Sequence, residues 1–535
     1  MKTFFSLLDE KFDKNADNDD LKIGDQLIKD FMINELLETF IHDYFRQKAV
    51  LSRIKSFSVE SATILYRQTI INDLINNDEL FKFWEQFRED LDALKDLYSM
   101  TMFEKNESMK SLKTFLVIEQ FIYMYNNVVN NINNIDKISK NDYSQLMNNI
   151  IDEFKSEQNM RIINEMQPIV MELRNELNTI RNIKLNRYFY QETNVENSIS
   201  KKNLNENASL MDRLSDLANK LGYENEIQLS RMTKMTRPEA LNNIFYSAIL
   251  SVHSDIFNKI ENFHAKYEDM FDKSWFNIIN EIDSVLGFAE FFKNIKNMKM
   301  PVCAVKMSEN GDLTIKNLYN ILLVIKGLNT EQIIPNDVII EDNKRFSILT
   351  GPNAGGKTIF LMSVGIAQLF FQASGWIVAE SGKMMVVNAL YTHFPAEEKN
   401  EKTGRLGEEI ARIEEITNNA KDGSMILLNE IFSSTKNDVA MELLSDLLIK
   451  LANKSIYGIL ITHFHELTDF INEFNVDKTN KIGQLAAMID ENEQGKRTYK
   501  ILPVNMKTSS YSHDILLKYK LTKEQLFSRI EEANL

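Results

Sequence analysis

A run of eight residues has the types and the spacing that bind a chain of phosphates. The pattern G-x-x-x-x-G-K-[ST] is matched, in order, by Gly351, Pro352, Asn353, Ala354, Gly355, Gly356, Lys357 and Thr358. The glycines let the backbone wrap an anion without Cβ clashes, and the loop N–H groups then face the phosphates at a helix N-terminus. Lys357 is expected to reach the β- and γ-phosphates, and the Thr358 hydroxyl to bind Mg²⁺. The motif predicts a nucleotide site.

A second polar pair follows the apolar run 425–428, namely Asn429 and Glu430. In phosphate-loop hydrolases a strand of this kind ends in an acid that holds Mg²⁺, and a following glutamate orients the attacking water. Glu430 fits the catalytic position. Asn429 stands where the acid is expected, and its amide oxygen can ligate a hard cation without bringing charge. The alternative is a core strand that merely ends in polar residues.

His463 follows a third apolar run, 457–462. A polar residue at the carboxyl end of a strand in a parallel sheet faces the ligand crevice. His463 is therefore a second catalytic candidate, able to sense the γ-phosphate or to place the water. The alternative is a helix-capping or core histidine. With His465 it makes no convincing zinc pair, and no cysteine is near to help.

The segment 403–409 opens an amphipathic helix that continues through Glu415. Its glycines, Gly404 and Gly407, together with a helix N-terminus form another end that attracts anions. One interpretation is that this segment contacts the nucleotide of a partner subunit in a dimer. The other is an ordinary helix cap.

The elements that must position these residues alternate between strand and helix. Apolar strands are expected at 346–350, 425–428 and 457–462, with helices over 359–373 and 439–452. Continuous apolar strands in strand–helix–strand order indicate a mostly parallel sheet covered on both faces. A late strand is expected at 496–503 and a final helix at 521–533.

The residues before 300 have a different character. They hold three of the 17 glycines and two of the seven prolines, and so few breakers predict long helices. One helical face is expected to step from Ile162 to Ile180, with Pro168 either kinking that helix or marking its start. The fold class is therefore α plus α/β, an all-helical region over 1–300 followed by a P-loop α/β domain over 301–535.

Composition limits the remaining possibilities. The net charge of −15 excludes a cationic surface of the histone type, although a local basic path for DNA remains possible. The single cysteine, Cys303, excludes an internal disulfide and a thiolate zinc site. Acids interrupt the apolar N-terminus too early for a signal peptide, and no run approaches the ~20 apolar residues of a membrane span. A cytoplasmic protein without a membrane partner is expected.

Several of these segments together resemble the MutS family of DNA mismatch repair ATPases. The loop at 350–358 is similar to the family's T-G-P-N-x-G-G-K-[ST], and 462–467 to its T-H-[YF]-x-E-L. Further similarity lies in the segments 335–337, 375–381, 428–438, 512–515 and 521–524.

The resemblance implies an ATP-hydrolysing homodimer whose helical arms enclose DNA. Residues 1–300 would be a lever- and clamp-like region, with a core at about 1–150 and 236–300 and an arm at about 151–235. Residues 301–535 would be the ATPase domain, ending in helices that form the dimer. ATP and Mg²⁺ are the implied cofactors.

The chain departs from the family pattern at its N-terminal end. The family's mismatch reader carries G-x-F-x-E, whereas Phe83-Trp84-Glu85 lacks the glycine and lies in a helical run. A short member without the mismatch-recognition domain is therefore expected. Two functions stay open: an ATP-switched clamp on mismatched, branched or otherwise abnormal DNA, and an ATP-switched scaffold that no longer binds DNA.

Overall fold

A computed structural model describes most of the chain. The described residues are 5–9, 21–102, 104, 107–138, 144–178, 253–395, 404–433, 435–476, 478–490 and 497–503. Most of the arm expected at about 151–235 lies outside them. The expected C-terminal helices, including the one at 521–533 and the dimer-forming segment, also lie outside them.

The chain folds into two compact units. The first comprises residues 1–4, 86–141 and 148–279, and the second comprises residues 5–85, 142–147 and 280–535. Helices α5 (Asp78–Met102) and α13 (Ile278–Asn297) have residues in both. No helix within the described ranges combines the length and the apolar composition needed to cross a bilayer.

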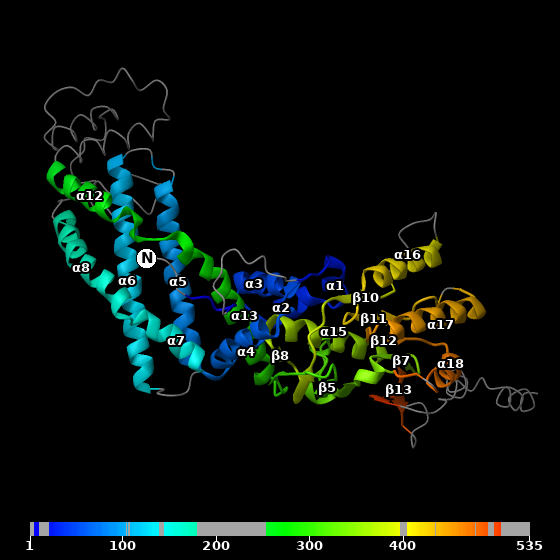
Figure 1. The fold of residues 1–535 in the computed structure, drawn as a ribbon. Helices are drawn as coiled ribbons and strands as arrows, with labels where there is room; N and C mark the ends of the chain where they lie inside the picture. The colour runs from blue at the N-terminus through cyan, green and yellow to red at the C-terminus, as the bar shows by residue number, and fades with distance from the viewer. Residues whose placement is uncertain are drawn as a thin grey trace, which may run out of the picture. The chain divides into compact units, whose positions relative to one another are not determined.

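The described part of the first unit is helical and packs around aromatic side chains. Besides its part of α5, it contains α6 (Glu107–Ile138), most of α7 (Gln145–Phe154), α8 (Glu157–Asn178), α12 (Ser254–Tyr267) and the short 3₁₀ turns Glu268–Met270 and Lys273–Asn277 (Figure 1). Trp275 is fully buried, and its ring lies 5.5 Å from that of Phe121 and 6.2 Å from that of Phe154. Edge-on and tilted ring pairs at these separations stabilise a core beyond the area they bury.

Helix α8 confirms the predicted apolar periodicity but shifts its first step. The helix begins at Glu157, so Pro168 lies inside it and does not mark its start. At the N-terminal end Ile163, not Ile162, is buried. Steps of three and four residues are both compatible with one helical face. The rest of the predicted face is buried within the described part, at Met166, Val170, Leu173 and Leu177.

The second unit contains a short helical segment at its N-terminal end. It includes α1 (Asp25–Asp30), α2 (Ile33–Phe40), α3 (Tyr44–Lys55) and α4 (Ser61–Asn76), with β1 (Leu21–Lys22) paired to β2 (Ser56–Phe57). Part of α13 packs with these helices, for example through the rings of Phe40 and Phe291 at 5.3 Å.

A six-stranded sheet forms the centre of the second unit. Its strand order is β10-β11-β12-β7-β13-β14, and every neighbouring pair is parallel except β13 and β14. The strands are β7 (Phe346–Thr350), β10 (Leu390–His393), β11 (Met425–Asn429), β12 (Tyr457–Ile461), β13 (Ile482–Ile489) and β14 (Arg497–Pro503). The strands expected at 346–350, 425–428 and 457–462 and the late strand are confirmed, as is the mostly parallel arrangement.

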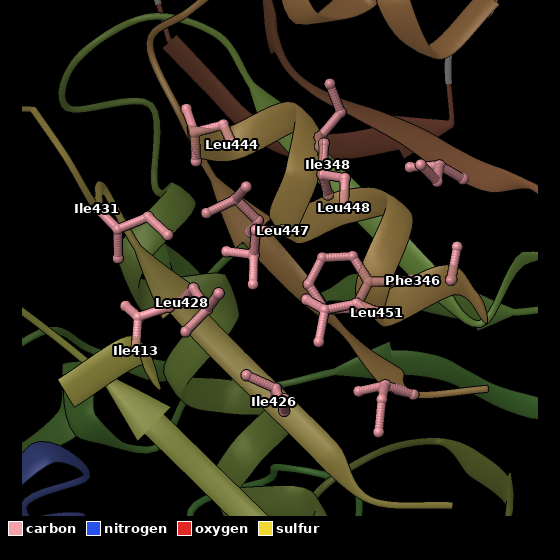
Figure 2. Close-up of a cluster of buried hydrophobic side chains, with 14 of the residues drawn as sticks. Phe346, Ile348, Ile413, Ile426, Leu428, Ile431, Leu444, Leu447, Leu448 and Leu451 are labelled. Atoms are coloured by element: carbon pink, nitrogen blue, oxygen red, sulfur yellow. The ribbon is translucent and has the colours of Figure 1, made fainter. Parts of the chain in front are cut away.

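Three helices cover one face of this sheet. They are α16 (Gly404–Asn419), α17 (Asn437–Asn453) and α18 (Leu467–Phe474). Figure 2 shows part of the core between these helices and the sheet, which includes Leu444 and Leu448 of α17, Ile348 of β7 and Leu428 of β11. Full burial of each such side chain stabilises the folded state by ~1.5–3 kcal/mol.

Helix α15 (Lys357–Ser374) follows β7 and is buried almost all round. It contacts β11 and β12 on one side, and α3, α4 and β2 on another. A helix that is apolar on every face requires such cover. The two buried amides of Gln368 and Gln372 are bonded to one another, and Gln372 Nε2 also donates to the Ser58 carbonyl at 3.0 Å.

Two smaller sheets and three short helical turns complete the second unit. A four-stranded sheet has the order β4-β9-β5-β6, and β3 pairs with β8. The strands are β3 (Cys303–Ala304), β4 (Lys306–Met307), β5 (Leu313–Leu318), β6 (Asn336–Ile340), β8 (Trp376–Ile377) and β9 (Ser381–Met384). The turns are α14 (Leu322–Ile325) and the 3₁₀ segments Thr330–Gln332 and Asp342–Lys344.

Gly365 provides a test of how tightly α15 is packed. A methyl group built on Gly365 would lie 2.1 Å from Phe31 Cζ, and the Phe31 ring is fully buried. Alanine gains ~1 kcal/mol over glycine inside a helix, but overpacking costs about 1–3 kcal/mol. We expect Gly365→Ala to lower the urea midpoint of unfolding. Gly24→Ala is the control, because among the described residues nothing lies within 4 Å of its added methyl group. An unchanged midpoint for Gly365→Ala would show that α15 can move away from Phe31.

Candidate functional site

The loop between β7 and α15 has a backbone that requires glycine at specific positions. Gly351 has φ +127° and Gly356, which precedes α15, has φ +86°. Both values favour glycine over residues with a Cβ. A methyl group on Gly355 would lie 2.9 Å from the Pro352 carbonyl oxygen. The glycines of the motif therefore let the loop close tightly and present the first N–H groups of α15 beside it.

Lys357 is folded back onto this loop. Its Nζ donates to the carbonyl oxygens of Gly351 at 2.8 Å and Pro352 at 3.0 Å, and the residue is only 4% exposed. Burial lowers the pKa of Lys357; the nearby Glu430 carboxylate opposes this effect, and the Arg497 guanidinium adds to it. The ammonium group thus lies at the centre of the loop, within electrostatic reach of residues from two other strands.

Parallel pairing brings the ends of β11 and β12 to the same edge of the sheet as this loop. Glu430 directly follows β11, and His463 lies two residues after β12. His463 Nε2 lies 2.7 Å from Glu430 Oε1. The hydrogen bond from His463 is the main cause that lowers the pKa of Glu430; burial opposes it, and the charges of His463 and Lys357 lower that pKa further. Glu430 is therefore a carboxylate at neutral pH, and it faces a histidine.

Asn429 is 6% exposed at the end of β11. Its Oδ1 has no hydrogen-bond partner among the residues that the structure describes. A buried acceptor without a partner is costly, and an amide oxygen is a ligand that hard cations accept. Thr358, in the first turn of α15, is partly exposed. Both side chains carry oxygen donors of the kind that Mg²⁺ accepts beside phosphates and water.

A dedicated protein cage for a metal is not seen. Within the described ranges, no three His, Cys, Asp or Glu residues are grouped so that they could hold an ion. Mg²⁺ ordinarily binds through one or two protein ligands plus phosphate oxygens and water. The donor set at Thr358 and Asn429 is of that kind.

Two residues of β14 lie against the loop and were not predicted as part of the site. Arg497 Nε donates to the Asn353 carbonyl at 3.3 Å. Tyr499 is half exposed, has φ +58°, and its ring carbon would lie 3.5 Å from a methyl group built on Gly356. The residue pattern predicted the strand at 496–503 but not its position beside the loop, because that position depends on how β13 and β14 extend the sheet beyond β7.

Gly404 and Gly407 begin α16. Gly404 is the first residue of the helix, and Gly407 is exposed in its first turn. Thr403 lies outside the described residues. The helix expected from this segment is therefore present, while its contact with a partner's nucleotide stays a prediction.

A comparison with protein-family models matches the segment that contains the loop and the strands around it. Residues 347–523 match the family model of MutS domain V, and this segment contains Lys357, Asn429, Glu430 and His463. The match supports a MutS-family protein over the residues that it covers.

Curated relatives of this chain are named DNA mismatch repair protein MutS. The protein of Clostridium perfringens is 21% identical over 471 residues, which is 85% of this chain and 47% of the relative. The protein of Petrotoga mobilis is 28% identical over 222 residues, 41% of this chain and 26% of the relative. The protein of Syntrophomonas wolfei is 30% identical over 154 residues, 27% of this chain and 17% of the relative. The chain spans about half the length of the first of these relatives and less of the others.

The ion-pair geometry at Glu430 predicts a pH dependence of stability. Because its pKa is lower in the folded state, ionised Glu430 contributes stability above its unfolded pKa, and the contribution is lost as the pH falls through the folded value. We expect the free energy of unfolding of the wild type, relative to that of Glu430→Gln, to fall as the pH drops below about 4. Urea titrations at each pH measure it. Glu415→Gln, on the exposed side of α16, is the control; a difference for Glu430→Gln that does not vary with pH would contradict the assignment.

Proposed function

We propose that this MutS-family chain binds and hydrolyses ATP and acts as an ATP-switched dimeric clamp on mismatched, branched or otherwise abnormal DNA. The proposal of ATP hydrolysis rests on one observation. Lys357, Glu430 and His463 are grouped at one edge of the parallel strands, beside the glycine-rich loop of residues 351–358. Family membership supports the clamp and its DNA substrate.

Nucleotide binding would use the loop of residues 351–358. The N–H groups at the start of α15 and the helix dipole favour the phosphates. Lys357 would exchange its bonds to the Gly351 and Pro352 carbonyls for bonds to the β- and γ-phosphates. Since both carbonyls already hold the ammonium group in the loop, little rearrangement is needed.

Thr358 and Asn429 would hold Mg²⁺ with the phosphates. The ion, when bound, neutralises charge that develops on the transferred phosphoryl group. Asn429 brings an oxygen but no negative charge, so the protein contributes less to ion affinity here than a carboxylate would. The unpartnered Oδ1 of Asn429 supports this role.

Hydrolysis would depend on Glu430 and His463. The Glu430 carboxylate, kept ionised by His463, would orient the attacking water and receive its proton. His463 is held within 2.7 Å of that carboxylate and is partly exposed, so it would contact the γ-phosphate or the same water. In a dimer, the α16 segment with Gly404 and Gly407 would approach the partner's nucleotide.

Two substitutions separate binding from turnover. Lys357→Ala should abolish ATP binding, because it removes the cation that the loop holds at its centre. Glu430→Gln should retain ATP but lose turnover by a factor of about 10² or more, the size of a general-base contribution. Calorimetric titration with ATP and steady-state phosphate release measure the two effects. Unchanged affinity in Lys357→Ala would refute the site, and wild-type turnover in Glu430→Gln would remove Glu430 from catalysis.

A scaffold that switches with ATP but does not bind DNA is the second candidate. The net charge of −15 favours it, since DNA binding depends on cationic contacts with phosphates. The grouping of Lys357, Glu430 and His463 supports both candidate functions equally, so measurements with DNA are needed to distinguish them.

The ATPase rate should respond to one form of DNA. We would measure it at two salt concentrations, with no DNA, a linear duplex, a mismatched duplex and a four-way junction. For a clamp, at least one of these changes the rate, and the effect weakens at higher salt because released counterions drive the binding. Hydrolysis that ignores every DNA, with no binding at low salt, would exclude the clamp and favour the scaffold.

A further inference from the structure

The turn that follows β11 has an unusual backbone. Glu430 has φ +52° and Phe432 has φ +59°, so two residues with side chains adopt the left-handed region within three positions. Each such residue is uncommon and costs free energy unless its surroundings fix it. The turn lies between a buried strand and α17, and it carries the carboxylate that faces His463. Whatever fixes the turn also fixes the direction of Glu430.

Three contacts fix it, and each comes from a different element. The Glu430 amide donates to the Ile461 carbonyl at 2.9 Å, and its carboxylate meets His463. The third contact is made by Glu409 of α16, whose Oε2 accepts the Phe432 N–H at 3.2 Å. Glu409 is only 6% exposed, and a buried N–H that loses its acceptor is strongly unfavourable.

Glu409 is itself held in place by its helix. Ile413 and Ile416, on the same helix, are buried in the core beneath the sheet face, as Figure 2 shows for Ile413. Arg412 Nη2 donates to the Thr392 carbonyl at the end of β10 at 3.0 Å. These contacts anchor α16 to the sheet, and so they fix the position from which the Glu409 carboxylate reaches the Phe432 N–H.

We infer that Glu409 is a positioning residue for hydrolysis: it holds the 430–432 turn in its left-handed conformation and so aims Glu430 at the water. The inference rests on the proposed ATP hydrolysis. Glu409 acts through the backbone and touches no reacting atom. It therefore affects the rate of the chemical step and leaves ATP affinity, which depends on the loop of residues 351–358, unchanged.

Two substitutions at one position test this assignment. Glu409→Leu keeps the size of the side chain but removes the acceptor. Glu409→Gln removes the charge and keeps an amide oxygen that can accept the Phe432 N–H. Glu415→Leu, at an exposed position of α16, is the matched control for placing leucine on this helix. Each variant is measured for kcat, for KM and for ATP affinity, with Mg²⁺ present.

We expect Glu409→Leu to lower kcat by at least about tenfold, the effect of about one buried hydrogen bond, with ATP affinity within about twofold of wild type. Glu409→Gln and Glu415→Leu should stay within about threefold of wild-type kcat. Wild-type kcat in Glu409→Leu would overturn the inference. An equal loss in Glu409→Gln would also overturn it, since charge and not the hydrogen bond would then matter.

Hydrogen exchange at Phe432 tests the same contact without turnover. The Phe432 amide should be protected in the wild type and exchange at least about tenfold faster in Glu409→Leu, but not in Glu409→Gln or Glu415→Leu. Equal protection in all four proteins would overturn the inference. If the wild type hydrolyses no ATP, the proposed function fails while this measurement still decides whether Glu409 holds the turn.

Discussion

Parallel pairing of three adjacent strands is the constraint on which the candidate site depends. Asn429 of β11 is in register with Ile461 of β12, which is in register with Leu349 of β7. The next residues are Glu430, Thr462 and Thr350. The phosphate-binding loop and the segments that carry Glu430 and His463 therefore start at the same height along the sheet. Neighbouring strands lie ~4.8 Å apart, so side chains from the ends of β11 and β12 can meet, as Glu430 and His463 do. A slip of one residue in β11 would turn Glu430 toward the opposite face of the sheet.

Helix α15 connects the loop to the helices at the N-terminal end of the second unit, because it is buried against them. Gly375 directly follows α15, and its carbonyl accepts a hydrogen bond from Gln68 of α4 at 2.7 Å. One turn earlier, Gln372 Nε2 donates to the Ser58 carbonyl. The first bond is partly buried and the second is buried, so moving α15 away from these partners would leave polar groups unpaired, which is more costly than at a surface. Any shift of the loop along the axis of α15 must therefore be shared by α4 or absorbed within the loop itself.

The sequence predicted the parts of this arrangement that local patterns encode. Apolar runs identified β7, β11 and β12, and the spacing of glycines and lysine identified the loop, because each of these signals lies within about ten residues. Arg497, Tyr499 and Glu409 escaped prediction because their neighbours are distant in the chain. Arg497 contacts Asn353 because the β13–β14 pair extends the sheet beyond β7. Glu409 contacts Phe432 because α16 packs against β10, the strand next to β11. Strand order and helix docking arise from the whole core, which a short window of sequence does not contain.

The charges around the loop favour an anion. Lys357 is buried and bonded to two carbonyls, the nearby Glu430 carboxylate opposes its charge, and Arg497 adds a second cation beside the same loop. Coulombic attraction grows as the surrounding medium becomes less polar, so burial, which lowers the pKa of Lys357, also strengthens its interaction with a phosphate. A triphosphate in the proposed site would replace carbonyl dipoles with full negative charges around Lys357 and would favour its protonated form. Under the proposed function, nucleotide binding and protonation of this lysine would therefore support each other, and the ammonium group would already lie inside the loop before the nucleotide binds.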